Sequence, residues 1–149
     1  MTEFLPYVYL LYMFISLYML SFFLILYFRN KNNFFSYPES KNSYEVSFIV
    51  PAYNEEKTIA DTIKHIFNID YENIKEVIVV NDCSTDNTEK IVKELLKKYP
   101  RLRIINNKKN LGNAAAAQNV GLNKVKTELI AVVDADSFPA RDSLKKMVG

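Results

Sequence analysis

The sequence predicts an α/β protein with a Rossmann-like, mostly parallel sheet, preceded by one transmembrane helix. Two observations predict this class. Residues 4–28 contain no charged side chain, and the rest of the chain alternates short β-branched runs with apolar residues at helical spacing. Strand–helix alternation is typical of a parallel sheet with right-handed crossovers. With 149 residues, the chain has room for one modest domain after the apolar segment.

The apolar segment follows a short N-terminal end, residues 1–3. At about 1.5 Å per residue it is long enough to span a hydrocarbon core of about 30 Å. A cleaved signal peptide is the alternative, but the residues before the apolar segment include Glu3 and no Lys or Arg. Arg29 and Lys31 follow the segment, so the positive-inside rule predicts a single-pass membrane protein with a cytoplasmic domain. Residues 29–44 read as a polar juxtamembrane linker.

The domain expected over residues 45–149 contains four strands, each a short run of β-branched and aliphatic residues. They are predicted over residues 46–50, 76–80, 102–106 and 129–133. Pro51 is expected to stop the first strand. The fourth strand, a continuous apolar run, is expected to be buried on both faces.

Helices are predicted between the strands, where apolar residues recur at helical spacing. They are expected over about residues 55–67, 86–98 and 112–125, and from Pro139 onward. Asp86 and Glu89 resemble a capping box at the start of the second helix, and Pro100 ends that helix.

Two carboxylates, Asp134 and Asp136, directly follow the fourth strand. Open parallel sheets bind ligands beyond the carboxyl ends of their strands. Because no basic residue lies beside them, the pair predicts a divalent-cation site. The alternative is that Asp134 caps a turn and Asp136 is only solvated. If the strand order is 3-2-1-4, the loops 51–55, 81–86 and 134–137 meet at this place.

Composition argues against several other kinds of site. The formal net charge of +2 is too small to indicate nucleic acid. The sequence has three glycines, one cysteine and one histidine. It therefore lacks glycine-rich phosphate-binding loops, an internal disulfide and a zinc cluster built from thiolates.

A nucleotide would find suitable contacts in the predicted loops. Tyr53 offers a face on which a base can stack, although a loop tyrosine can equally cover the end of the sheet. Asp82 is suited to accept hydrogen bonds from a base or a ribose, although Asn81-Asp82 also favours a turn. Without a glycine loop, the diphosphate requires a hard divalent cation, held by Asp134 and Asp136.

Four segments in order resemble glycosyltransferase family 2: Val46–Glu56, Val79–Asp86, Asn110–Gly112 with the alanine-rich helix after it, and Val133–Ser137. The resemblance implies a GT-A fold, here incomplete, and inverting sugar transfer from a nucleotide-sugar, usually a UDP-sugar, with Mg or Mn. It implies that Asp136, together with Asp134, binds the metal. It also implies nucleotide binding by Pro51, Ala52, Tyr53, Glu55, Asp82, Asp134 and Ala135.

The chain departs from the family pattern at Asn81 (often Asp), Cys83 (often Gly) and Asn113 (often Lys or Arg). The family's general base belongs to an acceptor half beyond residue 149, so no catalytic residue is assigned and activity of the chain by itself is left open. We expect the N-terminal part of a membrane-anchored, metal-dependent enzyme with a polysaccharide or lipid acceptor. The alternative is a non-catalytic, anchored fragment that binds nucleotide-sugar and needs a separate acceptor half.

Overall fold

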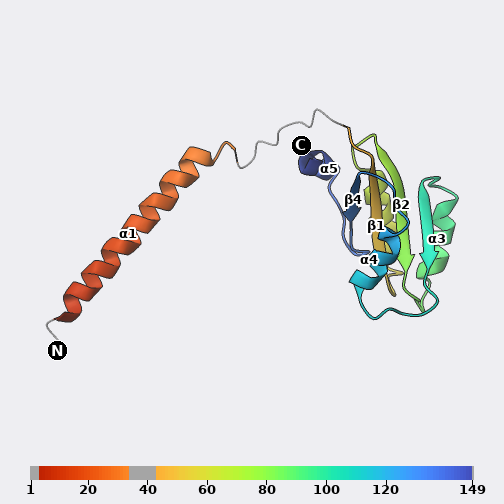
Figure 1. Cartoon of the computed structure of the whole chain (residues 1–149), viewed down its shortest axis with the longest axis horizontal. Helices are drawn as coiled ribbons and strands as arrows, with labels where there is room; N and C mark the ends of the chain where they lie inside the picture. Colours follow the sequence, from red (N-terminus) through yellow and green to blue (C-terminus); the bar gives the residue numbers. More distant parts are fainter. Residues whose placement is uncertain (1–3, 34–42, 149) are drawn as a thin grey trace. The chain divides into compact units, whose positions relative to one another are not determined.

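The computed structural model describes residues 4–33 and 43–148, and the chain divides into two units, Met1–Pro38 and Glu39–Gly149. Within the described residues, the first unit is a helix and the second is an α/β domain (Figure 1). The predicted class, a parallel α/β sheet preceded by an apolar helix, is confirmed. The predicted linker over residues 29–44 lies largely outside the described residues.

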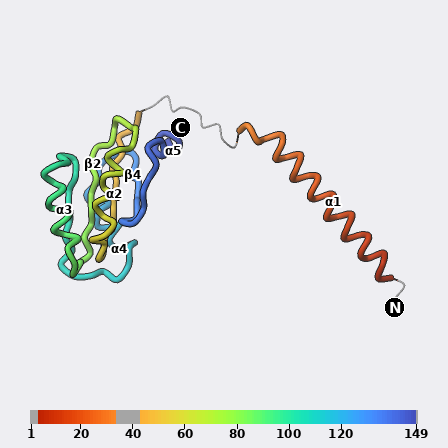
Figure 2. Tube along the Cα trace, turned by 180° about the vertical axis from the view of Figure 1, so that it is seen from behind, coloured from red at the N-terminus to blue at the C-terminus, as the bar shows by residue number. Residues whose placement is uncertain are grey.

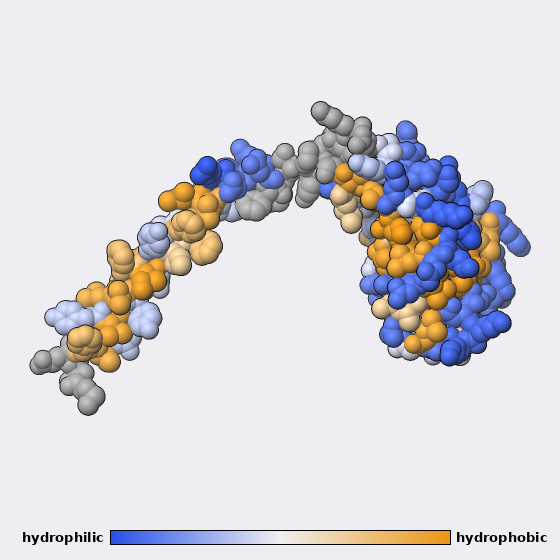
Figure 3. Space-filling view, in the orientation of Figure 1, coloured by the Kyte–Doolittle hydropathy of each residue, from blue (hydrophilic) through white to orange (hydrophobic). Residues whose placement is uncertain are grey.

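Helix α1 (Leu5–Asn30) has 26 residues, and none of them is buried. Apolar residues recur along its whole length without gathering on one side, so it has no separate polar face of the kind that soluble helices present to water. Figure 3 shows apolar residues along the visible face of this helix. Pro6 lies in the first turn, where its missing amide hydrogen costs little. Its length and composition make α1 a candidate membrane span, a property that it shares with signal sequences.

The described sheet contains four parallel strands in the order β3-β2-β1-β4. They are β1 (Val46–Ala52), β2 (Ile74–Asn81), β3 (Leu102–Asn106) and β4 (Leu129–Val132). This is the order on which the predicted convergence of loops depends. Because all four strands are parallel, their carboxyl ends lie at one edge of the sheet.

Helices follow the strands and cover both faces of the sheet. They are α2 (Ile59–Phe67), α3 (Thr88–Leu96), α4 (Ala114–Leu122) and α5 (Ser143–Val148). Helices α2 and α3 contact each other on one face, whereas α4 packs over β1 and β2 on the other. Figure 1 shows α4 in front of the sheet, and Figure 2, drawn from behind, shows α2 there.

Strand β1 lies in the centre of this arrangement and is buried along its whole length. Phe48 and Val50 point into the core under α2, whereas Ile49 points toward α4. On α4, Gly121 faces Ile49, and a Cβ atom at residue 121 would lie 2.7 Å from Ile49 Cγ2. The absence of a side chain at Gly121 therefore allows α4 to approach β1 closely.

The prediction that the fourth strand is buried on both faces is wrong. Leu129, Ile130 and Val132 are 36%, 40% and 45% exposed. In the described sheet β4 pairs only with β1, and α4 packs over β1 and β2 instead of over β4. Figure 3, drawn from the α4 side, shows apolar surface on this face of the domain. An apolar run predicts that something covers a strand, but it does not identify the covering element.

The predicted stop at Pro51 is also wrong, because β1 continues through Pro51 to Ala52. The Val133 amide donates to the Ile49 carbonyl, so the main-chain groups of Ile49, and by alternation those of Pro51, face β4. Strand pairing with β4 ends at Ile49–Val132. Proline at residue 51 therefore removes no ladder hydrogen bond.

Helix α2 begins at Ile59 and not near residue 55. The amides of Glu55 and Glu56, which the prediction placed in the first helical turn, donate to Thr88 Oγ1 at 2.8 Å and to Asp86 Oδ2 at 3.0 Å. A neighbouring loop thus competes with the helix for these residues. Helix α4 is also shorter than predicted, and the last helix begins at Ser143 instead of near Pro139.

The predicted capping box does not form at the start of α3. Its N-cap is Asn87, which makes no side-chain capping hydrogen bond. The Glu89 carboxylate does not return to Asp86, because it forms an ion pair with Lys93 at 2.6 Å and accepts a hydrogen bond from Asn106 at 3.0 Å. The sequence pattern was compatible with a capping box, but partners from outside the turn are closer.

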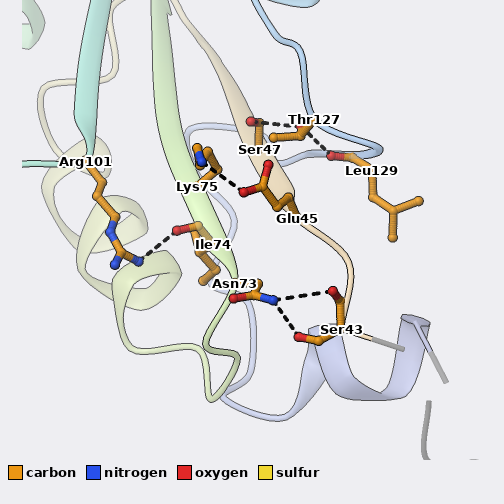
Figure 4. A network of polar contacts seen from close by, with 9 residues as sticks. All are labelled: Ser43, Glu45, Ser47, Asn73, Ile74, Lys75, Arg101, Thr127 and Leu129. Atoms are coloured by element: carbon orange, nitrogen blue, oxygen red, sulfur yellow. Dashed lines mark hydrogen bonds and ion pairs between the residues drawn. The ribbon is translucent and has the colours of Figure 1, made fainter. Parts of the chain in front are cut away.

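Polar contacts hold the opposite edge of the sheet, where the strands begin (Figure 4). Lys75 forms an ion pair with Glu45 at 2.9 Å. The buried Ser47 Oγ lies 3.0 Å from the Thr127 hydroxyl, which connects β1 to the segment before β4. These contacts stabilise the domain at the end away from the predicted site.

Candidate functional site

The loops that follow β1, β2 and β4 line one cleft of about 410 Å³ at the carboxyl edge of the sheet. The cleft contains every residue predicted to bind nucleotide or metal: Pro51, Ala52, Tyr53, Glu55, Asp82, Asp134, Ala135 and Asp136. The structure thus brings these residues together, and their roles as ligand-binding groups remain predictions. Another hollow is lined by charged residues of α3 and by Lys97, which follows that helix, and contains no strand-end residue.

The loop after β4 presents two carboxylates on either side of a buried residue. Asp134 and Asp136 are exposed, whereas Ala135 is 4% exposed and packs into the core. The Ser137 amide donates to the Asp134 carbonyl at 3.0 Å, which closes a turn. The Thr62 hydroxyl of α2 donates to the Ala135 carbonyl at 2.7 Å. Anchored backbone therefore holds both carboxylates at the cleft.

Asp82, which was predicted to contact the nucleoside, already has partners in the loop between β3 and α4. Its side chain is largely buried, and Oδ2 and Oδ1 lie 2.9 and 3.1 Å from the Leu111 amide nitrogen. Oδ1 also accepts a hydrogen bond from Asn107 Nδ2 at 2.7 Å. A carboxylate has about four acceptor positions, so Asp82 keeps acceptor capacity toward the cleft while it joins two loops.

The two family departures at the end of β2 have different surroundings. Asn81 is buried; its Nδ2 donates to Asn106 Oδ1 at 2.9 Å, and its Oδ1 accepts from the Ser84 amide at 3.2 Å. Asn81 is not among the described residues that line the cleft, and its side-chain amide supports the loop through these two hydrogen bonds. Cys83 has a φ of +60°, a conformation that favours glycine, and its Sγ donates to the Asn107 carbonyl at 3.0 Å.

Hydrogen bonds join the loops after β1 and β2 beside Tyr53. Asn54, which has a φ of +56°, accepts a hydrogen bond from the Thr85 amide at 2.8 Å. The backbone amide of Asn54 in turn donates to the Ser84 hydroxyl at 3.0 Å. Asparagine tolerates this left-handed conformation better than most residues. Tyr53 therefore lies on a fixed loop, with 49% of its surface exposed at the cleft.

Asp86 lies at the centre of a second set of contacts between the same loops. Its Oδ2 accepts from the Glu56 amide at 3.0 Å, and its Oδ1 accepts from the Thr88 amide and hydroxyl at 2.9 and 2.6 Å. Burial by itself would raise the pKa of Asp86, but these hydrogen bonds together outweigh burial and hold the pKa below its ordinary value. The ionised carboxylate therefore connects the β1 loop to the start of α3.

One wall of the cleft was not predicted from the sequence. That wall comes from the loop between β3 and α4 and from α4 itself: Asn110, Gly112, Asn113, Ala114 and Ala117. Strand order places β3 far from β4, but α4 packs over β1 and β2, so the connecting loop crosses back to the cleft. The segment Asn110–Gly112, which matched the family pattern, is the signal that could have identified this wall.

The cleft is acidic. Its described lining residues include four carboxylates, from Glu55, Asp82, Asp134 and Asp136, and neither Lys nor Arg. Among the described residues, no group of three or more His, Cys, Asp or Glu side chains is arranged around one metal position. Hard divalent cations often bind one or two carboxylates and complete their coordination with water and substrate phosphates. The Asp134–Asp136 pair fits such a cation.

Comparisons with known proteins identify relatives of the domain. The sequence model of the family described as Glycosyl transferase family 2 matches residues 47–149. A dolichyl-phosphate beta-glucosyltransferase of Trichomonas vaginalis is 38% identical over 115 residues, which cover 72% of this chain and 34% of the relative.

Two solved structures are also similar. The structure of S. aureus TarS 1-349 in complex with UDP-GlcNAc has a TM-score of 0.63 and 34% identity, and the match covers 69% of this chain and 30% of TarS. The mannosyltransferase PcManGT from Pyrobaculum calidifontis, in complex with GDP-Man and Mn²⁺, has a TM-score of 0.67 and 30% identity, with 84% and 38% covered. The chain thus spans about a third of the length of these three proteins.

Proposed function

The chain belongs to glycosyltransferase family 2, and from this premise we propose that its cleft binds a nucleotide-sugar, specifically a UDP-sugar, together with Mg or Mn. In this proposal the chain supplies the donor-binding, membrane-anchored part of an inverting glycosyltransferase that builds a polysaccharide or a glycolipid.

The charge of the cleft carries the proposal. A nucleotide-sugar brings a negatively charged diphosphate, and the described lining residues offer four carboxylates and no basic side chain. Two like charges about 4 Å apart repel by about 4 kcal/mol at an effective dielectric constant of about 20. A divalent cation held by Asp136 and Asp134 would turn this repulsion into attraction. When bound, such a cation supplies stabilisation of the charge that develops on the leaving nucleoside diphosphate.

The other lining residues suit the rest of the donor. Tyr53 is half exposed on a fixed loop and offers its ring to a base. Asp82 offers its remaining acceptor positions to hydrogens of a base or a ribose. Glu55 is held at the wall because its Oε2 accepts a hydrogen bond from the Thr58 hydroxyl at 2.7 Å. Pro51, Ala52 and Ala135 also line the cleft.

We place the acceptor at a membrane. Helix α1 is long and apolar enough to span a bilayer. The positive-inside rule, applied to Arg29 and Lys31 at its C-terminal end, supports a cytoplasmic domain. The relative from Trichomonas vaginalis is named for a dolichyl-phosphate acceptor, which supports a lipid-linked acceptor over a freely soluble one.

A second candidate function is a non-catalytic, anchored subunit that binds the donor and needs a separate acceptor half. The exposed apolar side chains of β4 favour it, because a sheet edge with Leu129, Ile130 and Val132 at its surface is a template for pairing with another strand. Both candidates share the same donor site and differ in turnover.

The test uses the full chain in detergent micelles. UDP and uridine are titrated by calorimetry with Mn²⁺ and with EDTA, and release of UDP from UDP-glucose is then measured with and without a polyprenyl phosphate. We expect Mn²⁺ to increase the affinity for UDP at least about tenfold and to leave uridine unchanged, because only UDP carries phosphates for the metal. Donor binding without turnover would favour the second candidate. Equal UDP affinity with Mn²⁺ and with EDTA would contradict the proposal.

A further inference from the structure

A threonine on the buried face of α2 contacts the backbone between the two cleft aspartates. Thr62 is fully buried among Ile59, Ile63 and Ile66, the apolar residues of that face. A helical threonine commonly donates its hydroxyl hydrogen to the preceding turn, and the Thr58 carbonyl lies 3.3 Å away. The Ala135 carbonyl is closer, at 2.7 Å. The hydroxyl has one hydrogen, and the distances assign it to the loop after β4.

This contact fixes the orientation of one peptide group. The carbonyl oxygen of Ala135 and the nitrogen of Asp136 belong to the same planar unit. A hydrogen bond that fixes the oxygen therefore also fixes the orientation of the Asp136 backbone nitrogen and of its bond to Cα. The Ala135 methyl group is buried in the core, and the Ser137 amide donates to the Asp134 carbonyl at 3.0 Å. With the turn closed at both ends, Thr62 fixes its middle.

We propose that Thr62 is a positioning residue for the cation: it sets the Ala135–Asp136 peptide so that the Asp136 carboxylate faces the cleft beside Asp134. The inference rests on the proposed function, because it concerns the same metal. Thr62 does not line the cleft among the described residues, so it acts through Asp136. Groups that orient metal ligands typically change metal affinity by about 10- to 100-fold when they are removed.

Four variants of the full chain in detergent micelles test this role. Thr62→Val keeps the shape of the side chain and removes the hydroxyl, Thr62→Ser keeps the hydroxyl, and Thr62→Ala replaces the valine variant if that variant does not fold. Ser47→Ala is the matched control, because it removes a buried hydroxyl contact with Thr127 at the opposite edge of the sheet. Mn²⁺ affinity in the presence of UDP is measured by electron paramagnetic resonance of free Mn²⁺, and uridine affinity by calorimetry.

We expect Thr62→Val to weaken Mn²⁺ binding about tenfold while uridine affinity stays within about twofold of the wild type, because the defect is confined to the β4 loop. Thr62→Ser should restore Mn²⁺ binding, and Ser47→Ala should lower the melting temperature without weakening Mn²⁺ binding.

Three outcomes would overturn the role of Thr62 and leave the proposed function intact. They are an unchanged Mn²⁺ affinity in Thr62→Val, equal losses of Mn²⁺ and uridine affinity in that variant, and a Mn²⁺ affinity that Thr62→Ser does not restore. A wild-type chain that binds no Mn²⁺ with UDP would overturn the proposed function, and the inference with it.

Discussion

The Asp82 carboxylate and the Leu111 amide join two walls of the cleft, with both carboxylate oxygens within 3.1 Å of the amide nitrogen. This relationship connects the end of β2 to the loop before α4. Nucleoside binding at Asp82 would therefore depend on the position of a loop that strand order alone places elsewhere.

The first prediction concerns Asp82→Asn. The new side chain has one acceptor oxygen in place of two, and its Nδ2 can face the Asn107 amide, another donor. Hydrogen bonds to charged groups contribute about 1.5–3 kcal/mol, so we expect uridine and UDP affinities to fall together by roughly tenfold. Calorimetric titration measures both. Asp61→Asn, which removes an exposed ion pair with Lys64 on α2, is the matched control. Unchanged uridine affinity would remove Asp82 from the nucleoside site.

The second prediction concerns Asp136→Ala. The side chain is exposed and its loop is anchored through Ala135 and Ser137, so the fold should tolerate the change. We expect the Mn²⁺-dependent increase in UDP affinity to disappear, the uridine affinity to stay unchanged, and the stability to change by less than about 0.5 kcal/mol. Glu128→Ala, at an exposed carboxylate before β4, is the control. A full metal response in Asp136→Ala would show that the cation binds elsewhere.

The third prediction concerns Gly121→Ala. A Cβ atom at residue 121 would lie 2.7 Å from Ile49 Cγ2 and 3.2 Å from Val80 Cγ2, so α4 would have to move away from the sheet. Overpacking typically costs about 1–3 kcal/mol, whereas alanine gains about 1 kcal/mol of helix propensity over glycine. We expect a net loss of about 1 kcal/mol in the free energy of unfolding, measured by denaturant titration. Ala115→Gly, at an exposed position of α4, is the control. Its change in unfolding free energy measures the difference in helix propensity between alanine and glycine without a change in core packing.

The fold could be predicted from the sequence because its elements carry local signals. Apolar runs identified the strands, their alternation with helical repeats identified a parallel sheet, and the polar residues after the first, second and fourth strands predicted residues that line one cleft. The exposed β4 could not be predicted, since burial depends on which elements cover a strand. The late start of α2 and the missing capping box share one cause: Glu55, Glu56 and Glu89 bond to other segments. Apart from Lys93, four residues after Glu89, these partners are distant in sequence, so local patterns do not report them.

The fourth prediction concerns Cys83, which has a φ of +60° where the family often has glycine. A left-handed residue other than glycine costs about 1–3 kcal/mol, and the thiol hydrogen bond to Asn107 is a weak one. Cys83→Gly should therefore raise the melting temperature by a few degrees, whereas Cys83→Val, with a branched side chain, should lower it. Thermal unfolding followed by circular dichroism measures both. A stabilised valine variant would contradict the argument from backbone strain.

The last prediction is a pH dependence that originates at Asp86. Hydrogen bonds from Thr88 and from the Glu56 amide lower the pKa of this carboxyl in the folded chain, although burial opposes them. A carboxyl with a lowered folded pKa stabilises the protein above its unfolded pKa of about 3.9, and this stabilisation is lost as the pH falls through the folded pKa. We therefore expect the difference in unfolding free energy between wild type and Asp86→Asn to be constant from about pH 7 to 5 and to shrink below about pH 4. Denaturant titrations at several pH values measure this difference.

Asp61→Asn is again the control, because its exposed ion pair should give a much smaller difference. A difference that grows as the pH falls would show that Asp86 does not act as an ionised acceptor between the two loops.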